Sequence, residues 1–309
     1  MSLVERAIKK LQDAKQSPAA TLPPSAYSRQ VAAASLVARE PAAIPASADG
    51  LVALEKLPHS GRIAKIDKDA LRSMELLPPV NVQRQIASQY QLIKRPLIAA
   101  AIGKNEPALP NGRTIMLTSA LPGEGKTFTS INLALSLALE KDVEVLLVDA
   151  DVAKPHVSRI FGLEAEPGLL DLLADGNLQP ESFIVDTDVP NLMLMSAGTH
   201  AADATELLAS RRMDEVVAQL TAAEPRRIVL LDSPPLMLAS EARALVAHAG
   251  QIVLVVRADS TSQQAVLDAI DAIGEGHPVS LILNQSSSPP SAGYYGYGSY
   301  GIAAPEGTE

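Results

Sequence analysis

Residues 113–128 read Arg-Thr-Ile-Met-Leu-Thr-Ser-Ala-Leu-Pro-Gly-Glu-Gly-Lys-Thr-Phe, and they carry the strongest structural signal in the chain. Its first half is apolar, like a buried strand, and a helix-like run follows its glycines. A strand, a glycine loop and a helix in this order are typical of a phosphate-binding P-loop. The glycines let backbone N–H groups approach phosphate oxygens, and the helix directs its positive end toward the same anion.

The loop residues are candidate ligands for ATP and its Mg²⁺. We expect Lys126 to reach the β- and γ-phosphates and the Thr127 hydroxyl to bind Mg²⁺. Ala120 stands where the first glycine of such a motif is usual. A chance Gly-Glu-Gly-Lys turn is the alternative, and the flanking strand and helix disfavour it. The predicted nucleotide-binding residues are Pro122, Gly123, Glu124, Gly125, Lys126, Thr127 and Phe128.

Apolar runs alternate with helix-like segments after residue 113. The expected strands are 114–119, 143–149, 192–196, 227–232, 251–257 and 279–284. The expected helices are 126–140, 155–161, 168–174, 205–222, 239–248 and 261–274. Most of these strands are continuously apolar, as in a parallel sheet buried on both faces. The pattern predicts an α/β P-loop NTPase domain with a doubly wound, mostly parallel sheet and helices on both faces.

Three aspartates follow predicted strands. Asp149 and Asp151 come after the second strand, and Asp232 ends the fourth. Since ligands of such sheets bind beyond the carboxyl ends of the strands, we expect these carboxylates beside the P-loop. Thr127 with one or two of them would suit Mg²⁺, and a remaining carboxylate could accept a proton from an attacking hydroxyl. Helix capping is the alternative for any one of them.

Bulk composition excludes several classes of function. The chain has 309 residues and a net charge of −9. It contains no cysteine, which rules out disulfides, thiolate zinc sites and a cysteine nucleophile. The five histidines show no ligand spacing. Residues 81–309 hold 15 Lys/Arg against 27 Asp/Glu, which argues against nucleic acid as a partner. Without a signal peptide or a long apolar run, we expect a cytoplasmic protein with no transmembrane segment.

The chain divides into four expected parts. Residues 1–16 have the pattern of an amphipathic helix, which could lie on the protein's own surface, on a partner or on a membrane face. Residues 17–80 are expected to be a largely disordered linker. Residues 81–285 form the P-loop domain and begin with a helix that Pro96 should end or kink. Residues 286–309 form a flexible tail.

The tail holds a tyrosine cluster interleaved with glycine. Such spacing is costly in a core strand and suits a flexible, solvated segment. A tyrosine hydroxyl near neutral pH needs a base before it can attack phosphorus. A low-complexity tail without chemistry is the alternative. The candidate phosphorylation sites are Tyr294, Tyr295, Tyr297 and Tyr300.

Together these motifs resemble the bacterial tyrosine kinases of exopolysaccharide systems. The resemblance rests on the 119–127 loop, the Val148–Asp151 strand end with Lys154-Pro155, the Leu231–Pro235 strand end, and the tyrosine cluster. The segment from Gly198 to Ser210 is also similar. Residues 1–7 and 93–97 are similar to the exosortase-associated (PEP-CTERM/XrtA-type) subgroup of autokinases.

The resemblance implies an ATP-dependent autokinase that phosphorylates the tail of a neighbouring subunit and so regulates exopolysaccharide polymerisation and export. It implies a homo-oligomer at the inner face of the cell membrane, with a membrane-embedded chain-length determinant or polysaccharide co-polymerase as its partner. Lys126 and the loop amides would hold phosphate, and Thr127, Asp151 and Asp232 would serve Mg²⁺. Asp149 would be the base, although its roles and those of Asp151 stay open.

Two departures from the family pattern stand out. The Glu-x-x-Arg-x-x-Arg motif that locks family members into a ring has Gln89, Leu92 and Arg95 at its positions, which disfavours a charge-paired ring. Ala153 also replaces a usual basic residue. One alternative function is a positioning ATPase of the MinD/ParA kind, whose signature lysine would stand at Leu121. Another is a non-catalytic nucleotide-binding scaffold of polysaccharide assembly.

Overall fold

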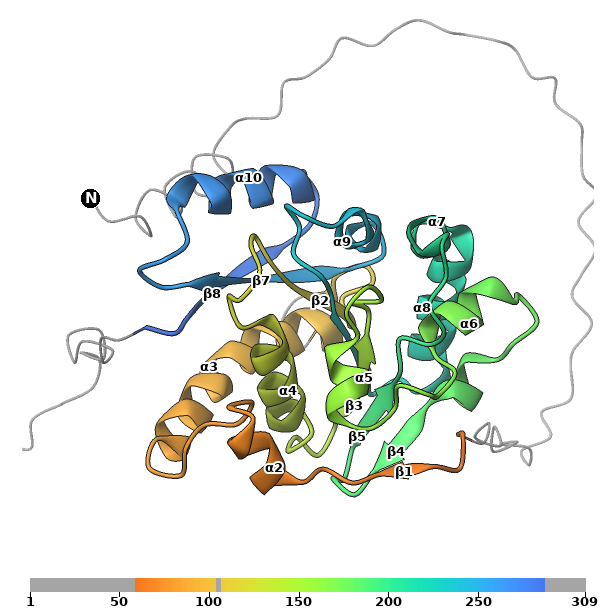
Figure 1. Ribbon diagram of the computed structural model, residues 1–309, viewed down its shortest axis with the longest axis horizontal. Helices are drawn as coiled ribbons and strands as arrows, with labels where there is room; N and C mark the ends of the chain where they lie inside the picture. Colours follow the sequence, from red (N-terminus) through yellow and green to blue (C-terminus); the bar gives the residue numbers. More distant parts are fainter. Residues whose placement is uncertain (1–58, 104–106, 287–309) are drawn as a thin grey trace, which may run out of the picture. The chain divides into compact units, whose positions relative to one another are not determined.

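A computed structural model describes residues 59–103 and 107–286, which contain one eight-stranded sheet (Figure 1). The strand order is β1-β4-β5-β3-β6-β2-β7-β8, and every pair is parallel except β4 with β5. All the expected strands are present, and the α/β prediction is confirmed. The strands are β1 (Ile63–Ala64), β2 (Thr114–Ser119), β3 (Glu144–Asp149), β4 (Val185–Thr187), β5 (Leu192–Met195), β6 (Arg227–Asp232), β7 (Gln251–Arg257) and β8 (Val279–Asn284).

Helices cover both faces of this sheet (Figure 1). One face carries α2 (Lys68–Ser73), α3 (Gln83–Ile102), α4 (Lys126–Leu137) and α5 (His156–Ile160). The other face carries α6 (Leu169–Ala174), α7 (Ala204–Leu208), α8 (Arg211–Ala223), α9 (Ser240–Val246) and α10 (Gln263–Ile273), with a 3₁₀ turn η1 (Pro180–Phe183) beside α8. Because both faces are covered, the central strands are buried throughout, as their apolar sequences predict.

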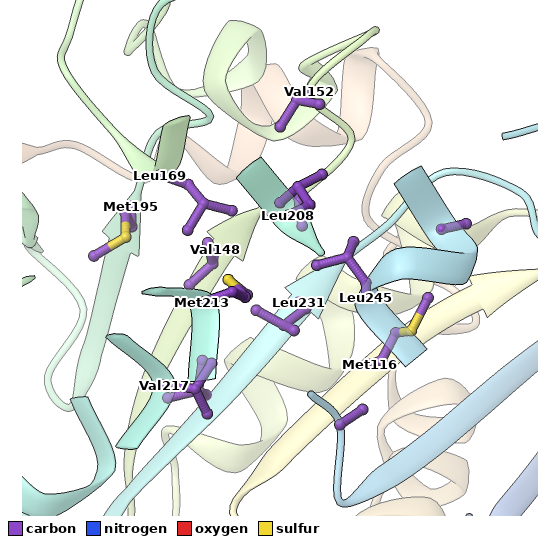
Figure 2. Close-up of a cluster of buried hydrophobic side chains, with 14 of the residues drawn as sticks. Met116, Val148, Val152, Leu169, Met195, Leu208, Met213, Val217, Leu231 and Leu245 are labelled. Carbon is purple, nitrogen blue, oxygen red and sulfur yellow. The ribbon is translucent and has the colours of Figure 1, made fainter. Parts of the chain in front are cut away.

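Alternate residues of each central strand enter different cores. In β2, Met116 packs with α6–α9, whereas Ile115 and Leu117 pack with the α3 and α4 side. Figure 2 shows the first of these cores, where Val148 and Leu231 of neighbouring strands lie among side chains of the covering helices. Since the sheet is held from both faces, its carboxyl edge is a rigid base for a site.

The helix before the P-loop does not end at Pro96. α3 continues to Ile102 with Pro96 inside it, although proline removes one backbone hydrogen bond from a helix. Beyond the proline, Leu97 and Ala101 are buried against the core. We infer that this burial offsets the lost hydrogen bond, so tertiary packing overrides the local signal.

The expected helix 205–222 is two helices. α7 ends at Leu208 and α8 begins at Arg211, with Ser210 between them in an extended conformation. The Ser210 hydroxyl donates a hydrogen bond to the carbonyl of Leu207 at 2.6 Å. A serine that satisfies a carbonyl in this way favours a chain break over a continued helix.

Residues 59–80, which the sequence assigned to the linker, instead contribute β1 and α2 to the fold. Ile66, Leu71 and Leu77 are all buried in the core beside α3 and α4. Asp67 caps α2 by accepting hydrogen bonds from the backbone of the first turn. The short apolar fragments of this region are therefore core residues.

The predicted N-terminal helix and the tyrosine tail lie outside the described residues. Among residues 59–103 and 107–286, no helix combines the length and the apolar character that crossing a bilayer requires.

Candidate active site

The P-loop joins β2 to α4 and has the backbone shape that its glycines predict. Gly123 and Gly125 have φ values of +77° and +91°, a region that residues with a Cβ rarely adopt. Gly125 is the N-cap of α4, and a Cβ placed there would collide with the side-chain amide nitrogen, Nδ2, of Asn284. The free N–H groups of the first turn of α4 therefore face the position where a phosphate is expected.

Glu124 holds this loop from inside the protein. Its side chain is 2% exposed, accepts the backbone N–H of Leu121 at 2.7 Å and accepts the hydroxyl of Thr261. Its own carbonyl accepts the side-chain amide of Asn284 at 2.9 Å. Because the carboxylate is committed to these partners, only the backbone of Glu124 is left to serve a nucleotide.

Asp232 ties the first turn of α4 to the end of β6. Its two carboxylate oxygens accept the Thr127 hydroxyl at 2.9 Å and the Ser130 hydroxyl at 2.7 Å. Burial raises the pKa of this carboxyl, while the two hydroxyls and the nearby charge of Lys126 act to lower it. The Asp232 carboxylate thus lies beside the P-loop, as the sequence predicts, while its role toward Mg²⁺ stays a prediction.

Asp149 lies directly opposite Asp232 in the β3–β6 pairing. One oxygen of Asp149, Oδ2, accepts the backbone N–H and the hydroxyl of Ser158 at 2.7 and 2.8 Å. The other, Oδ1, is buried and has no hydrogen-bond partner among the described residues. Burial raises the pKa of this carboxyl to about 7. Asp149 therefore offers one fixed oxygen and one unused acceptor.

Asp151 stands just beyond the end of β3 and is 7% exposed. Its carboxylate accepts the backbone N–H of Lys154 at 3.1 Å. Burial raises the pKa of Asp151, and the backbone N–H of Lys154 and the charges of Lys126 and His156 oppose this effect. The side chain is thus close to the lysine of the P-loop.

These residues fit a divalent cation by their chemistry. Asp149, Asp151 and Asp232 repel one another within a buried site, and a bound cation would relieve that repulsion. In the part of the chain that the structure describes, no three His, Cys, Asp or Glu side chains form a ready-made metal cluster. A site of one hydroxyl and one or two carboxylates, completed by water and phosphate, is what Mg²⁺ commonly uses.

The principal side chains of this edge were predictable from the sequence, but the residues that support them were not. The five that the structure brings together are Lys126, Thr127, Asp149, Asp151 and Asp232. The four missed supports are Ser130, Ser158, Thr261 and Asn284. Of these, only Ser130 had a signal in the sequence, because it lies one helical turn after the P-loop lysine.

Comparison with known sequences gives a consistent result. Residues 112–278 match the family model described as an AAA domain. The chain is 34% identical over 185 residues to the putative tyrosine-protein kinase EpsB of Ralstonia solanacearum, covering 60% of this chain and 24% of EpsB. It is 30% identical over 214 residues to the tyrosine-protein kinase YwqD of Bacillus subtilis, covering 68% of this chain and 86% of YwqD. The chain thus spans about a quarter of the length of EpsB.

Solved structures agree with the sequence relatives. The kinase domain of VpsO has a TM-score of 0.54 at 27% identity, covering 67% of this chain and 98% of that domain. The BceF tyrosine kinase domain has a TM-score of 0.53 at 28% identity, covering 72% and 93%.

Proposed function

Because the chain belongs to the bacterial tyrosine-protein kinase family, we propose that it is an ATP-dependent tyrosine autokinase. Its substrate is the tail of a neighbouring copy, at Tyr294, Tyr295, Tyr297 and Tyr300. The observation that carries this proposal is the P-loop with three buried carboxylates at the same sheet edge. A simple binding module has no need to bury carboxylates together beside a phosphate site.

ATP binding would use the backbone of the P-loop and two of its side chains. The N–H groups at the start of α4 would hold the β- and γ-phosphates, with Lys126 neutralising their charge. Thr127 would exchange its hydrogen bond to Asp232 for a place beside Mg²⁺, with Asp151 and Asp232 completing the metal's surroundings. Mg²⁺ would supply charge neutralisation as the phosphoryl group transfers.

We propose Asp149 as the general base. Its Oδ1 has no hydrogen-bond partner among the described residues, and its Oδ2 is fixed by Ser158. In the proposed step, Oδ1 takes the phenolic proton while the tyrosine oxygen forms a bond to the γ-phosphorus. The bond from that phosphorus to the β–γ bridging oxygen breaks, and ADP leaves. Lys126, Asp149 and Asp151 are the proposed catalytic residues.

The cellular role is proposed from the same relatives. We infer regulation of exopolysaccharide polymerisation and export, at the inner face of the membrane, with a membrane-embedded chain-length determinant or co-polymerase as partner. Residues 1–7 and 93–97 favour the exosortase-associated subgroup. Transfer between copies requires an oligomer. Gln89 and Leu92 depart from the family's ring motif, so this oligomer would not use the charge pairs of that motif. The Leu92 position is on the surface of α3, where the residue is 54% exposed.

Labelled ATP separates the three possible activities. With purified protein and Mg²⁺, label on tyrosine supports the kinase, free phosphate alone indicates a positioning ATPase, and neither indicates a scaffold. Lys126→Met must abolish the label, since it removes the charge on the phosphates. The matched control is Lys141→Met, an exposed lysine beyond the far end of α4, which should label as the wild type does.

A further inference from the structure

A small groove lies between α2, α3 and α4, among residues that the proposed chemistry does not use. Its volume is about 210 Å³, and Leu77, Ile86 and Leu139 contribute apolar walls. Pockets for drug-sized ligands usually measure about 300–1,000 Å³. This groove therefore suits one side chain of a peptide better than a nucleotide or a cofactor.

Two cations line the same groove. Lys68 and Arg72 are one helical turn apart on α2 and so share a face. Lys68 is exposed and has no hydrogen bond or ion pair within the described ranges. Arg72 pairs with Asp69 at 2.6 Å, but Asp69 is 93% exposed, and such surface pairs are weak. The Nη2 of Arg72 also donates to the Oε1 of Gln83, another groove residue, at 3.5 Å, and its buried Nε has no partner among the described residues. The groove thus combines apolar walls with available positive charge.

We propose that this groove binds a phosphotyrosine of the chain's own C-terminal tail. This proposal rests on the proposed function, because that activity produces the phosphotyrosine. The aromatic ring would fill the apolar space, and the phosphate would meet Lys68 and Arg72, in the way that basic groups recognise phosphorylated motifs. The tail supplies four tyrosines and has no lysine or arginine after residue 284, so its charge complements the groove.

The tail is long enough to reach the groove of its own chain. Asn284, which ends β8, hydrogen-bonds to the Glu124 carbonyl just before α4. Ser136 of the groove is ten residues along α4 from Lys126, or roughly 15 Å at the helical rise. Tyr294 is ten residues beyond Asn284, which spans up to roughly 33 Å when extended. No second copy is needed for this contact.

Docking would separate a finished tail from the catalytic edge. The groove lies along α4, away from the P-loop end that holds Asp232 and Thr127. A phosphorylated tail carries about −1.5 to −2 charges per phosphotyrosine and is repelled by the carboxylates of that edge. The groove offers it positive charge instead. Phosphorylated tails would therefore be held by their own domain and no longer occupy the sites of neighbours.

The test uses synthetic peptides and the full chain carrying Lys126→Met, which cannot phosphorylate its own tail. A fluorescent peptide of residues 288–301, phosphorylated at Tyr294, is titrated in parallel with its unphosphorylated form. We expect the phosphopeptide to bind at least about tenfold more tightly, as a charge-assisted contact requires. Lys68→Gln and Arg72→Gln should each weaken that binding at least about fivefold. Lys65→Gln, an exposed lysine outside the groove, is the matched control and should change nothing.

A second variant tests the apolar part of the groove. Ala87→Phe fills the space from α3 without altering charge, and it should also weaken phosphopeptide binding while thermal unfolding stays unchanged. Equal affinity for the two peptides would overturn the proposal. A loss of phosphopeptide binding with Lys65→Gln as large as that with Lys68→Gln or Arg72→Gln would overturn it as well. If inorganic phosphate displaces the fluorescent phosphopeptide as effectively as unlabelled phosphopeptide does, the groove is a general anion site and the proposal is overturned.

A membrane surface and an inactive kinase would each give a different result from phosphotyrosine docking. Binding of phosphatidylglycerol vesicles that depends on Lys68 and Arg72, without phosphopeptide binding, would assign the groove to a membrane surface and overturn the proposal. Failure of the proposed function would appear elsewhere, as absence of label on the wild-type tail with ATP. The peptide titration does not depend on that activity, so the two failures are distinguishable.

Discussion

Asp149→Asn should stabilise the metal-free protein at neutral pH while removing the proposed base. Burial raises the pKa of the Asp149 carboxyl to about 7 from its ordinary value of 3.8. Near pH 6 the folded protein therefore keeps a proton that the unfolded chain has already released. For an acid with a raised pKa, the stabilising effect is complete below about pH 4 and is lost as pH rises through the folded value.

The size of the effect follows from the hydrogen bonds and the pH interval. The amide oxygen of asparagine can still accept the N–H and hydroxyl of Ser158, which Asp149 now accepts at 2.7 and 2.8 Å. The amide nitrogen replaces Oδ1, which has no partner among described residues. Each pH unit between 5 and 7 lowers wild-type stability by about 1.4 kcal/mol relative to the variant. Over the whole interval, the difference in free energy of unfolding between the variant and the wild type therefore grows by roughly 2–3 kcal/mol.

Urea unfolding in the presence of EDTA, followed by circular dichroism at pH 5 and pH 7.5, measures this difference. The free energy of unfolding of Asp149→Asn minus that of the wild type should grow by this amount between the two conditions. Asp271→Asn, which changes an exposed carboxylate on α10, is the control and should give a difference that does not grow with pH. If the difference for Asp149→Asn is the same at both pH values, the pKa of Asp149 is not raised by its burial.

Three other substitutions test the supports of the site and the fold. Gly125→Ala should abolish ATP binding in equilibrium dialysis with the circular dichroism spectrum retained, because its φ of +91° and its contact with the end of β8 exclude a Cβ. Glu181→Ala should lower the free energy of unfolding in urea by about 3–5 kcal/mol, because it leaves the buried guanidinium of Arg227 without its 2.6 Å carboxylate partner; a cost under about 1 kcal/mol would contradict this. Ser130→Ala should cost about 1–3 kcal/mol in the same assay through the lost hydrogen bond to Asp232, and an unchanged midpoint would count against that role.

The central strands were predictable because their residues are apolar without interruption. β1 and β4 are only two and three residues long, too short to show a period. The contribution of residues 59–80 was missed because its apolar residues are scattered, and their burial depends on α3 and α4. The expectation that Pro96 ends the helix is wrong for the same reason, since packing of the residues beyond it decides where α3 ends, whereas a kink at Pro96 stays a prediction.

The site was predictable to the extent that it is local in sequence. The P-loop and the aspartates at the strand ends are read from short motifs that the sheet topology brings together. The sequence could not predict that the Glu124 side chain turns inward to accept the Thr261 hydroxyl, because Thr261 is 137 residues away. Asn284 is 160 residues away. Contacts of this range follow only from the completed fold.

Phosphate transfer between two marked copies tests whether one subunit phosphorylates the tail of another. One copy carries Lys126→Met and keeps its tail, and the other keeps Lys126 but has phenylalanine in place of Tyr294, Tyr295, Tyr297 and Tyr300. When the two are mixed with labelled ATP and Mg²⁺, we predict phosphate on the tail tyrosines of the Lys126→Met copy. Free phosphate from ATP with no label on that tail would show that the protein is not a tyrosine kinase acting between copies.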